Sequence, residues 1–198
     1  SSKARKTLKT FGQSAWLLPA TQWAPASGGR NLASILKARK FSYFLTWMIL
    51  AASTLGENGV EGIVDLVKQG GGKKESTILG FGEKVVAWMA GFANGAMVHQ
   101  LDYDDCHDVG VVHPGAATVP AALAVAEREG KIRGKEFITA VALGADVVCR
   151  LSQPLTRDTF DYGFARTGTI GKYGATVAAG KLLGLTVEKM VSAFGLVL

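Results

Sequence analysis

From Gly59 onward, the apolar residues of this sequence recur with the period of an α-helix. Between Glu83 and His99 they follow a spacing of about 3.6 residues, and the strict alternation of a half-buried strand is missing. Glycines mark short breaks between such stretches. The pattern predicts an all-α domain, built as a helical bundle, with at most a brief extended segment over Ser76–Gly82.

The breaks and the potential capping residues predict where each helix begins and ends. The expected helices cover residues 60–68, 83–99, 116–129 and 134–151, a segment capped by Thr167 or Thr169 that stops at Gly184, and a last segment capped by Thr186. Gly91 and Gly95 lie inside the second helix, where each costs about 1 kcal/mol relative to alanine. We therefore expect both glycines to lie against a neighbouring helix. The apolar window Phe41–Ala52 is too short for a membrane span, which needs about 20 residues, and predicts a buried helix.

The composition excludes several classes of protein. With 198 residues, of which 48% are apolar, the chain can bury a sizeable core. Its two cysteines, Cys106 and Cys149, are too few for a disulfide framework, a four-cysteine zinc site or an iron–sulfur centre. We expect a reducing, intracellular compartment, either cytoplasmic or mitochondrial.

The net charge of +6 belongs to one end of the chain. Residues 1–40 contain eight of the 22 basic residues and no acid, so the remainder carries 14 basic and 16 acidic residues. A continuous basic groove for nucleic acid is therefore not expected. Residues 1–45 form a basic N-terminal arm. Its composition fits a mitochondrial transit segment, and it equally fits an ordinary arm or a stretch foreign to the rest of the protein.

All three histidines of the chain lie in one region together with four aspartates. The residues are His99, Asp102, Asp104, Asp105, His107, Asp108 and His113. An imidazole whose proton affinity is set by a nearby carboxylate is suited to general acid–base catalysis. The alternative is structural: Asp104 and Asp105 would cap the following helix, and His99 would pack in the core. Composition alone leaves both alternatives open.

Metal binding and nucleophilic catalysis are not expected of this loop. An EF-hand is excluded, because Cys106 and His107 occupy positions that require an oxygen ligand and a glycine. The spacing of His107 and His113 matches no zinc pattern. Cys106 has no lysine or arginine nearby in sequence that would lower the pKa of its thiol.

A second candidate site is the glycine-rich helix start within Phe164–Gly174. The free N–H groups and the positive end of a helix suit a carboxylate or a phosphate. The GxxxxGK[ST] pattern of a P-loop is absent. Thr167, Gly168, Thr169 and Lys172 are the candidate substrate-binding residues. Close helix packing is the alternative explanation of the glycines.

Several motifs follow one another in order along the chain. They are Ala93-Asn94-Gly95, the DYDD run at 102–105, His113-Pro114, GADVVCRL at 144–151 and TGTIGKYGATVAAGKLLGL at 167–185. In this succession the chain resembles the MmgE/PrpD family over residues 59–198. The resemblance implies an all-helical domain, here a partial one over residues 46–198, without the smaller α+β lid domain that usually completes it. It also implies a homodimer that uses no metal or cofactor.

The MmgE/PrpD family includes 2-methylcitrate dehydratase, cis-aconitate decarboxylase and iminodisuccinate epimerase, which act on small di- and tricarboxylates. By this resemblance, Asp102 and His113 match family active-site residues and would move a proton during dehydration or decarboxylation. Ala165 departs from the pattern, since the family commonly has a histidine after the Gly-Phe pair, and family chains are longer. The alternative is a catalytically inactive scaffold of the same family with a structural or interaction role. Neither interpretation expects a nucleic-acid or membrane partner.

Overall fold

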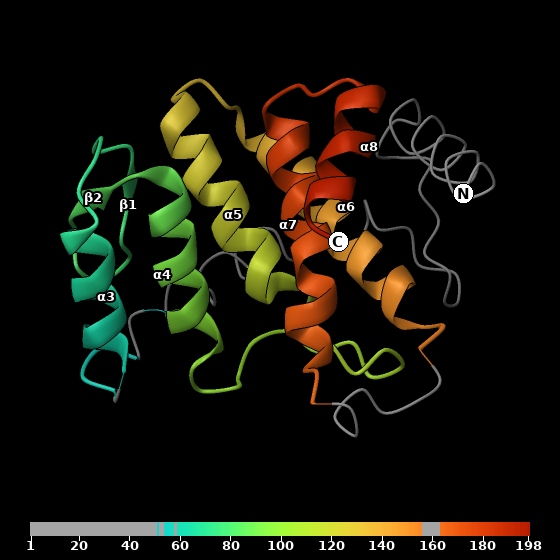
Figure 1. Ribbon diagram of the computed structural model, residues 1–198, viewed down its shortest axis with the longest axis horizontal. Coiled ribbons are helices and arrows are strands. Elements are labelled where there is room, and N and C mark those ends of the chain that lie inside the picture. The colour runs from blue at the N-terminus through green and yellow to red at the C-terminus, as the bar shows by residue number, and fades with distance from the viewer. Residues whose placement is uncertain (1–50, 52–53, 58, 156–162) are drawn as a thin grey trace.

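The computed structural model describes residue 51 and residues 54–57, 59–155 and 163–198. The described part consists of six α-helices and one two-stranded hairpin, so the predicted all-α class is confirmed (Figure 1). None of these six helices is both long and apolar enough to span a bilayer. The basic arm and nearly all of the helix predicted over residues 41–52 lie outside the described residues.

The helices lie close to their predicted positions. In chain order the elements are α3 (Val60–Gln69), β1 (Ser76–Thr77), β2 (Lys84–Val85), α4 (Ala87–His99), α5 (Pro114–Glu129), α6 (Gly134–Ser152), α7 (Arg166–Leu182) and α8 (Val187–Leu196). β1 and β2 pair antiparallel, with Ser76 opposite Val85. Thr186 caps α8 as predicted, because its hydroxyl oxygen accepts a hydrogen bond from the Lys189 N–H at 3.4 Å.

The start of α4 differs from the prediction, since the helix begins at Ala87 and not at residue 83. Residues 84–85 form β2 instead, and the carbonyl oxygen of Val85 accepts a hydrogen bond from the Glu75 N–H at 3.0 Å. The Glu75 side chain in turn accepts one from the Ala87 N–H at 3.2 Å, which satisfies a free donor of the first helical turn. A tertiary contact with β1 therefore overrides the local helical period.

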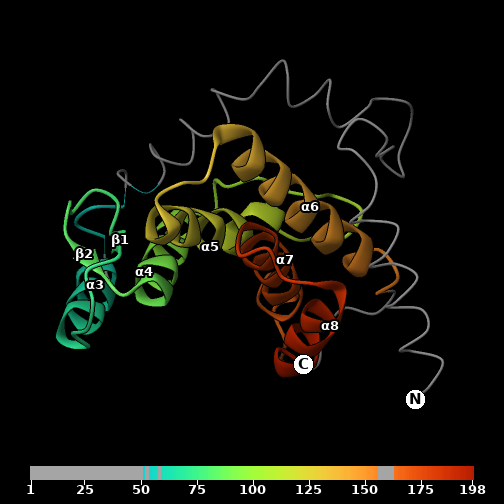
Figure 2. The ribbon, with the colours of Figure 1, turned by 90° about the horizontal axis from the view of Figure 1, so that it is seen from above.

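Helices α3, α4, α5 and α7 follow one another across the molecule (Figure 1). Helix α6 packs on both α5 and α7, and α8 packs on α7 (Figure 2). One buried cluster, which includes Ile78 and Met97, joins α3, the hairpin and α4. A second, which includes Ala122, Ala140 and Ala178, joins α5, α6 and α7. The C-terminal end of α4 and the N-terminal ends of α5 and α7 lie at the same end of the bundle (Figure 1).

The predicted packing role of Gly91 and Gly95 is confirmed, because both bring α4 against α5. A Cβ atom added at Gly91 would lie 3.6 Å from the Cβ of Ala124, and one added at Gly95 would lie 3.4 Å from the carbonyl oxygen of Ala116. That oxygen lacks its usual helical donor, because the residue four positions later is Pro120. Helix α4 therefore approaches α5 where the hydrogen-bond ladder of α5 is interrupted.

Helices α5, α6 and α7 meet at two facing glycines. A Cβ atom at Gly144 of α6 would lie 2.5 Å from Cγ2 of Thr118 and 2.6 Å from the carbonyl oxygen of Gly174 on α7. A Cβ atom at Gly174 would lie 2.9 Å from the carbonyl oxygen of Gly144. Backbone atoms cannot rotate away as side chains can, so only glycine fits at both positions.

We predict that Gly144→Ala lowers the free energy of unfolding by about 1–3 kcal/mol, the usual cost of overpacking a core. Gly134→Ala is the matched control, because Gly134 begins the same helix and has no atom within 4 Å of its added Cβ. Urea denaturation followed by circular dichroism measures both. Equal midpoints for the two variants would contradict the packing described here.

Candidate active site

The loop between α4 and α5 brings its acidic residues back toward the start of α5. Asp102 adopts a left-handed backbone conformation with φ of 56°, which aspartate tolerates better than most residues. Its N–H donates a hydrogen bond to the carbonyl oxygen of His99 at 3.2 Å. The chain therefore turns sharply just after α4 ends.

The backbone of His113 is fixed by the proline that follows it. His113 is the N-cap residue of α5 with φ −103° and ψ 91°, and Pro114 occupies the first helical position. A residue before proline is driven to this extended region, and proline is well suited to the first turn of a helix. The His113 N–H also donates to the Thr167 hydroxyl oxygen at 3.2 Å, which connects the loop to α7.

The remainder of the loop is held against α6 and α7. The His107 N–H donates to the carbonyl oxygen of Val112 at 2.9 Å, and the Val112 side chain is fully buried. Gly110 lies so close to α6 that an added Cβ would be 1.9 Å from the Ser152 hydroxyl oxygen. The Arg166 side chain donates to the Gly110 carbonyl oxygen at 3.3 Å. The loop is therefore anchored on both sides of its tip.

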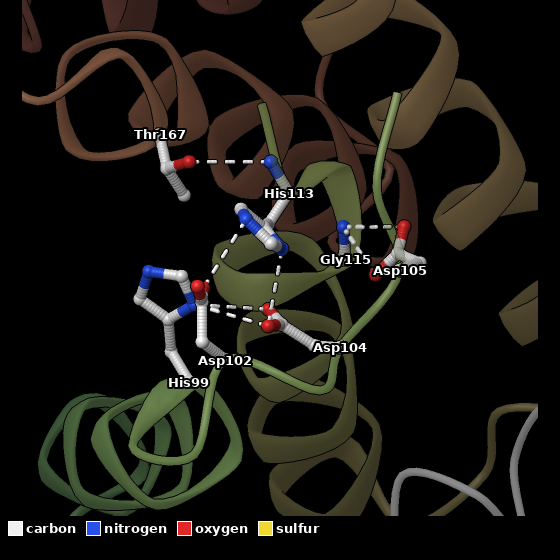
Figure 3. A network of polar contacts seen from close by, with 7 residues as sticks. All are labelled: His99, Asp102, Asp104, Asp105, His113, Gly115 and Thr167. Atoms are coloured by element: carbon white, nitrogen blue, oxygen red, sulfur yellow. Dashed lines mark hydrogen bonds and ion pairs between the residues drawn. The ribbon is translucent and has the colours of Figure 1, made fainter. Parts of the chain in front are cut away.

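Four side chains converge on this anchored loop, as Figure 3 shows. The Nδ1 atom of His99 lies 3.1 Å from both carboxylate oxygens of Asp104. His113 lies between two acids, with Nδ1 3.1 Å from Oδ1 of Asp104 and Nε2 3.3 Å from Oδ1 of Asp102. The two imidazole rings meet edge to face, with centroids 4.9 Å apart. The structure thus brings the sequence-predicted residues Asp102 and His113 together.

Burial differs sharply among these four side chains. Asp104 is fully buried, His113 is 18% exposed, His99 is 40% exposed and Asp102 is 76% exposed. The prediction that His99 packs in the core is therefore wrong. The hydrogen bond to Asp104 raises the pKa of His99, burial opposes the rise, and the negative charges of Asp104 and Asp102 add to it.

Nδ1 of His113 is buried and makes no directed hydrogen bond. The nearby Asp104 oxygen, at 3.1 Å, is close enough for ion pairing but lies off the direction of a ring N–H bond. The contact between His113 and Asp104 is consequently electrostatic. The buried carboxylate of Asp104 thus makes a hydrogen bond with His99 and an electrostatic contact with His113.

The same four residues also offer the atom types of a transition-metal site. One ligand atom from each of His99, Asp102, Asp104 and His113 can be chosen so that all lie within 4.8 Å of one another. Ion pairing between imidazole and carboxylate already explains each close contact, so we assign no metal to them.

Asp105 points away from this cluster and caps α5. The Gly115 N–H lies 3.1 Å from both carboxylate oxygens of Asp105 (Figure 3). A carboxylate at this position satisfies a free N–H group and interacts favourably with the positive end of the helix. The predicted capping role is confirmed for Asp105, whereas Asp104 lies between the histidines.

A groove of about 950 Å³ opens between α4, α5 and α7. His99 lines it, and so do three of the four predicted substrate-binding residues, Thr167, Gly168 and Lys172. The Lys172 ammonium group donates to the Leu198 carbonyl oxygen at 3.0 Å. Thr169 is not among the lining residues, and its hydroxyl donates a hydrogen bond to the Ala165 carbonyl oxygen at the start of α7.

The predicted capping of α7 by Thr167 or Thr169 is wrong. The N-cap residue is Ala165, whose side chain makes no capping hydrogen bond. The hydroxyl of Thr167 is engaged by His113, and that of Thr169 lies inside the helix as a donor to the residue four positions earlier.

Neither cysteine has an activated thiol. Burial raises the pKa of Cys149 to about 11, and the nearby charge of Asp146 adds to that rise. The pKa of Cys106 is also raised, by burial first and then by Asp108. A thiolate nucleophile is therefore disfavoured at neutral pH, in agreement with the expectation for Cys106.

Comparison with known proteins extends the sequence resemblance. A profile of the MmgE/PrpD N-terminal domain matches residues 30–198. Cis-aconitate decarboxylase of Aspergillus terreus is 29% identical over 124 residues, which cover 60% of this chain and 25% of that protein. A cis-aconitate decarboxylase-like protein of Aspergillus oryzae is 25% identical over 127 residues, 61% of this chain and 26% of that protein. Cis-aconitate decarboxylase of Homo sapiens is 32% identical over 105 residues, 50% of this chain and 21% of that protein. The matched segment therefore spans about a quarter of the length of these relatives.

We predict that Asp105→Ala lowers the free energy of unfolding by about 0.5–2 kcal/mol, the usual value of a helix cap. Asp105→Asn should cost less, because the amide oxygen can still accept the Gly115 N–H. Asp108→Ala, at an exposed position of the same loop, serves as the control. Thermal unfolding of the three variants tests the capping role of Asp105. Equal midpoint temperatures for Asp105→Ala and Asp108→Ala would contradict it.

Proposed function

Because the chain belongs to the MmgE/PrpD family, we propose that it transfers protons on a small di- or tricarboxylate, in a dehydration or a decarboxylation. The observation that carries the proposal is the contact between Asp102 and His113, 3.3 Å from Oδ1 to Nε2, on an anchored loop. An imidazole takes or returns a proton near neutral pH, and a neighbouring carboxylate stabilises its charged form.

Cis-aconitate is the first substrate to test, because the relatives described above are named cis-aconitate decarboxylases or resemble them. In a decarboxylation, the bond to the departing carboxyl group breaks and its electron pair stays on the substrate carbon. A protonated His113 would supply the proton that this carbon needs. Asp102 would balance the charge of the imidazolium before the step.

The substrate carboxylates require cations or N–H donors. Lys172 lines the groove and carries a positive charge, and the start of α7 adds backbone N–H groups near Thr167 and Gly168. These three residues are the proposed carboxylate-binding residues of this chain. Homodimerisation stays a prediction that rests on the family resemblance.

Ala165 favours the alternative function. It lines the groove where the family commonly places a histidine, and an alanine side chain cannot transfer a proton. A chain that binds the acid without converting it would be a binding scaffold. Binding and turnover therefore have to be measured separately.

We predict that His113→Ala lowers kcat for cis-aconitate or 2-methylcitrate by about 10²- to 10⁴-fold, the usual contribution of a general acid–base group. His107→Ala is the control, because that side chain faces Gln153 and not the cluster. Turnover is followed by chromatography of the acids, and binding by isothermal titration. Unchanged turnover in His113→Ala would refute the role of His113, and tight binding without turnover would favour the scaffold.

We further predict that treatment with EDTA leaves turnover unchanged, since the proposed proton transfer uses side chains alone. The measurement compares the turnover of the untreated protein, of the protein dialysed against EDTA, and of the EDTA-treated protein after addition of Zn²⁺. Loss of turnover on chelation and its recovery with Zn²⁺ would show that turnover requires a metal ion, for which His99, Asp102, Asp104 and His113 offer ligand atoms.

A further inference from the structure

The proposed pair of Asp102 and His113 leaves two members of the cluster unused. His99 is 40% exposed and lines the groove, whereas His113 is 18% exposed and is not among the lining residues. Asp104 is fully buried behind both rings. The imidazole that faces the open groove is therefore that of His99.

The orientation of His99 resembles that of an imidazole prepared for proton transfer. Its Nδ1 faces the Asp104 carboxylate, and Figure 3 shows its other ring nitrogen on the opposite side of the ring. A carboxylate at Nδ1 holds the proton on that nitrogen and leaves Nε2 free to accept one. Asp104 also stabilises the imidazolium that forms, because opposite charges attract strongly where water is excluded.

We propose that His99 is a second proton-transfer residue of the site, facing the groove, and that Asp104 is the positioning residue that orients His99 and couples it to His113. This inference rests on the proposed function. In a dehydration, Nε2 of His99 takes a proton from a carbon beside a carboxylate, and the electron pair of that C–H bond forms the C=C bond as the C–O bond of the neighbouring hydroxyl group breaks. The imidazolium then gives its proton to the departing oxygen, which leaves as water, and Asp104 stays ionised throughout.

A purely structural role for Asp104 explains less of the arrangement. A buried carboxylate needs partners, and one histidine with a directed hydrogen bond would provide them. Here the carboxylate contacts two imidazoles, each at 3.1 Å, and one of them lines the groove. The carboxylate of Asp104 therefore links the imidazole that lines the groove to the one that contacts Asp102.

The charged groups around His99 come from three elements. The loop contributes Asp104 and Asp102, which raise the pKa of His99, and the start of α5 contributes His113. Lys172 of α7 lines the same groove. A bound polycarboxylate would add negative charge beside His99 and so favour the protonated form of His99 when the substrate is present.

Nuclear magnetic resonance of the imidazole nitrogens tests the coupling without requiring turnover. The chain has three histidines, so single substitutions assign every signal. We expect the proton of neutral His99 on Nδ1, and a pKa for His99 that falls in Asp104→Asn, because the hydrogen bond and the negative charge of Asp104 raise it. Addition of cis-aconitate should shift the His99 signals and leave those of His107 in place. An unchanged His99 titration in Asp104→Asn would overturn the role of Asp104.

Kinetics test the catalytic role itself. We expect His99→Gln to lower kcat about 100-fold or more with little change in KM, and to remove one limb of the pH profile. Asp104→Asn should act in the same way and Asp104→Glu should restore part of the activity, whereas His107→Gln should behave like the unmodified chain. If Asp104→Asn does not fold, His99→Gln still tests the proposal, since His99 is partly exposed.

Full activity and an unchanged pH profile in His99→Gln would overturn the inference. If His113→Ala is inactive in the same assay, the proposed function nevertheless stands.

Discussion

A buried negative charge determines the shape of the candidate site. The side chain of Asp104 is fully buried. Its carboxylate lies 3.1 Å from Nδ1 of His99 and 3.1 Å from Nδ1 of His113. An isolated buried charge is strongly destabilising, so the folded loop must keep both imidazoles beside it. Because His99 ends α4 and His113 precedes α5, this one set of contacts also fixes how the two helices are joined.

The packing of the bundle also fixes the position of α7 relative to this loop. Gly144 and Gly174 allow α6 and α7 to approach until side chains could not fit between them. Thr167 of the same helix accepts a hydrogen bond from the His113 N–H at 3.2 Å, although the two residues are 54 positions apart in sequence. The groove and the cluster therefore share a wall, and a shift of α7 would disturb both. Gly144 and Gly174, which lie outside the cluster, thus help to determine the geometry of the candidate site.

The sequence predicted the helices well, because their periodicity is a local pattern. The family resemblance singled out Asp102 and His113, which the structure places 3.3 Å apart. The sequence did not predict the role of Asp104, which depends on the left-handed turn at Asp102 and on the direction of His99 at the end of α4. The capping of α7 was predicted wrongly for a similar reason. The hydroxyl of Thr167 is engaged by a residue distant in sequence, and local capping rules contain no information on such contacts.

The proposed function assigns proton transfer and substrate recognition to different parts of the fold. The acids and imidazoles come from the α4–α5 loop and its two flanking residues, whereas the cation and the free N–H groups come from α7. Much of the remainder of the groove is apolar, with Trp88 and Phe92 exposed, and we propose that a compact polycarboxylate binds at the end lined by His99, Thr167 and Lys172. At that end Ala165 contributes a methyl group that cannot exchange protons. Among the described residues that line the groove, His99 is the imidazole, and for this reason we propose it for proton transfer on the groove side of the cluster.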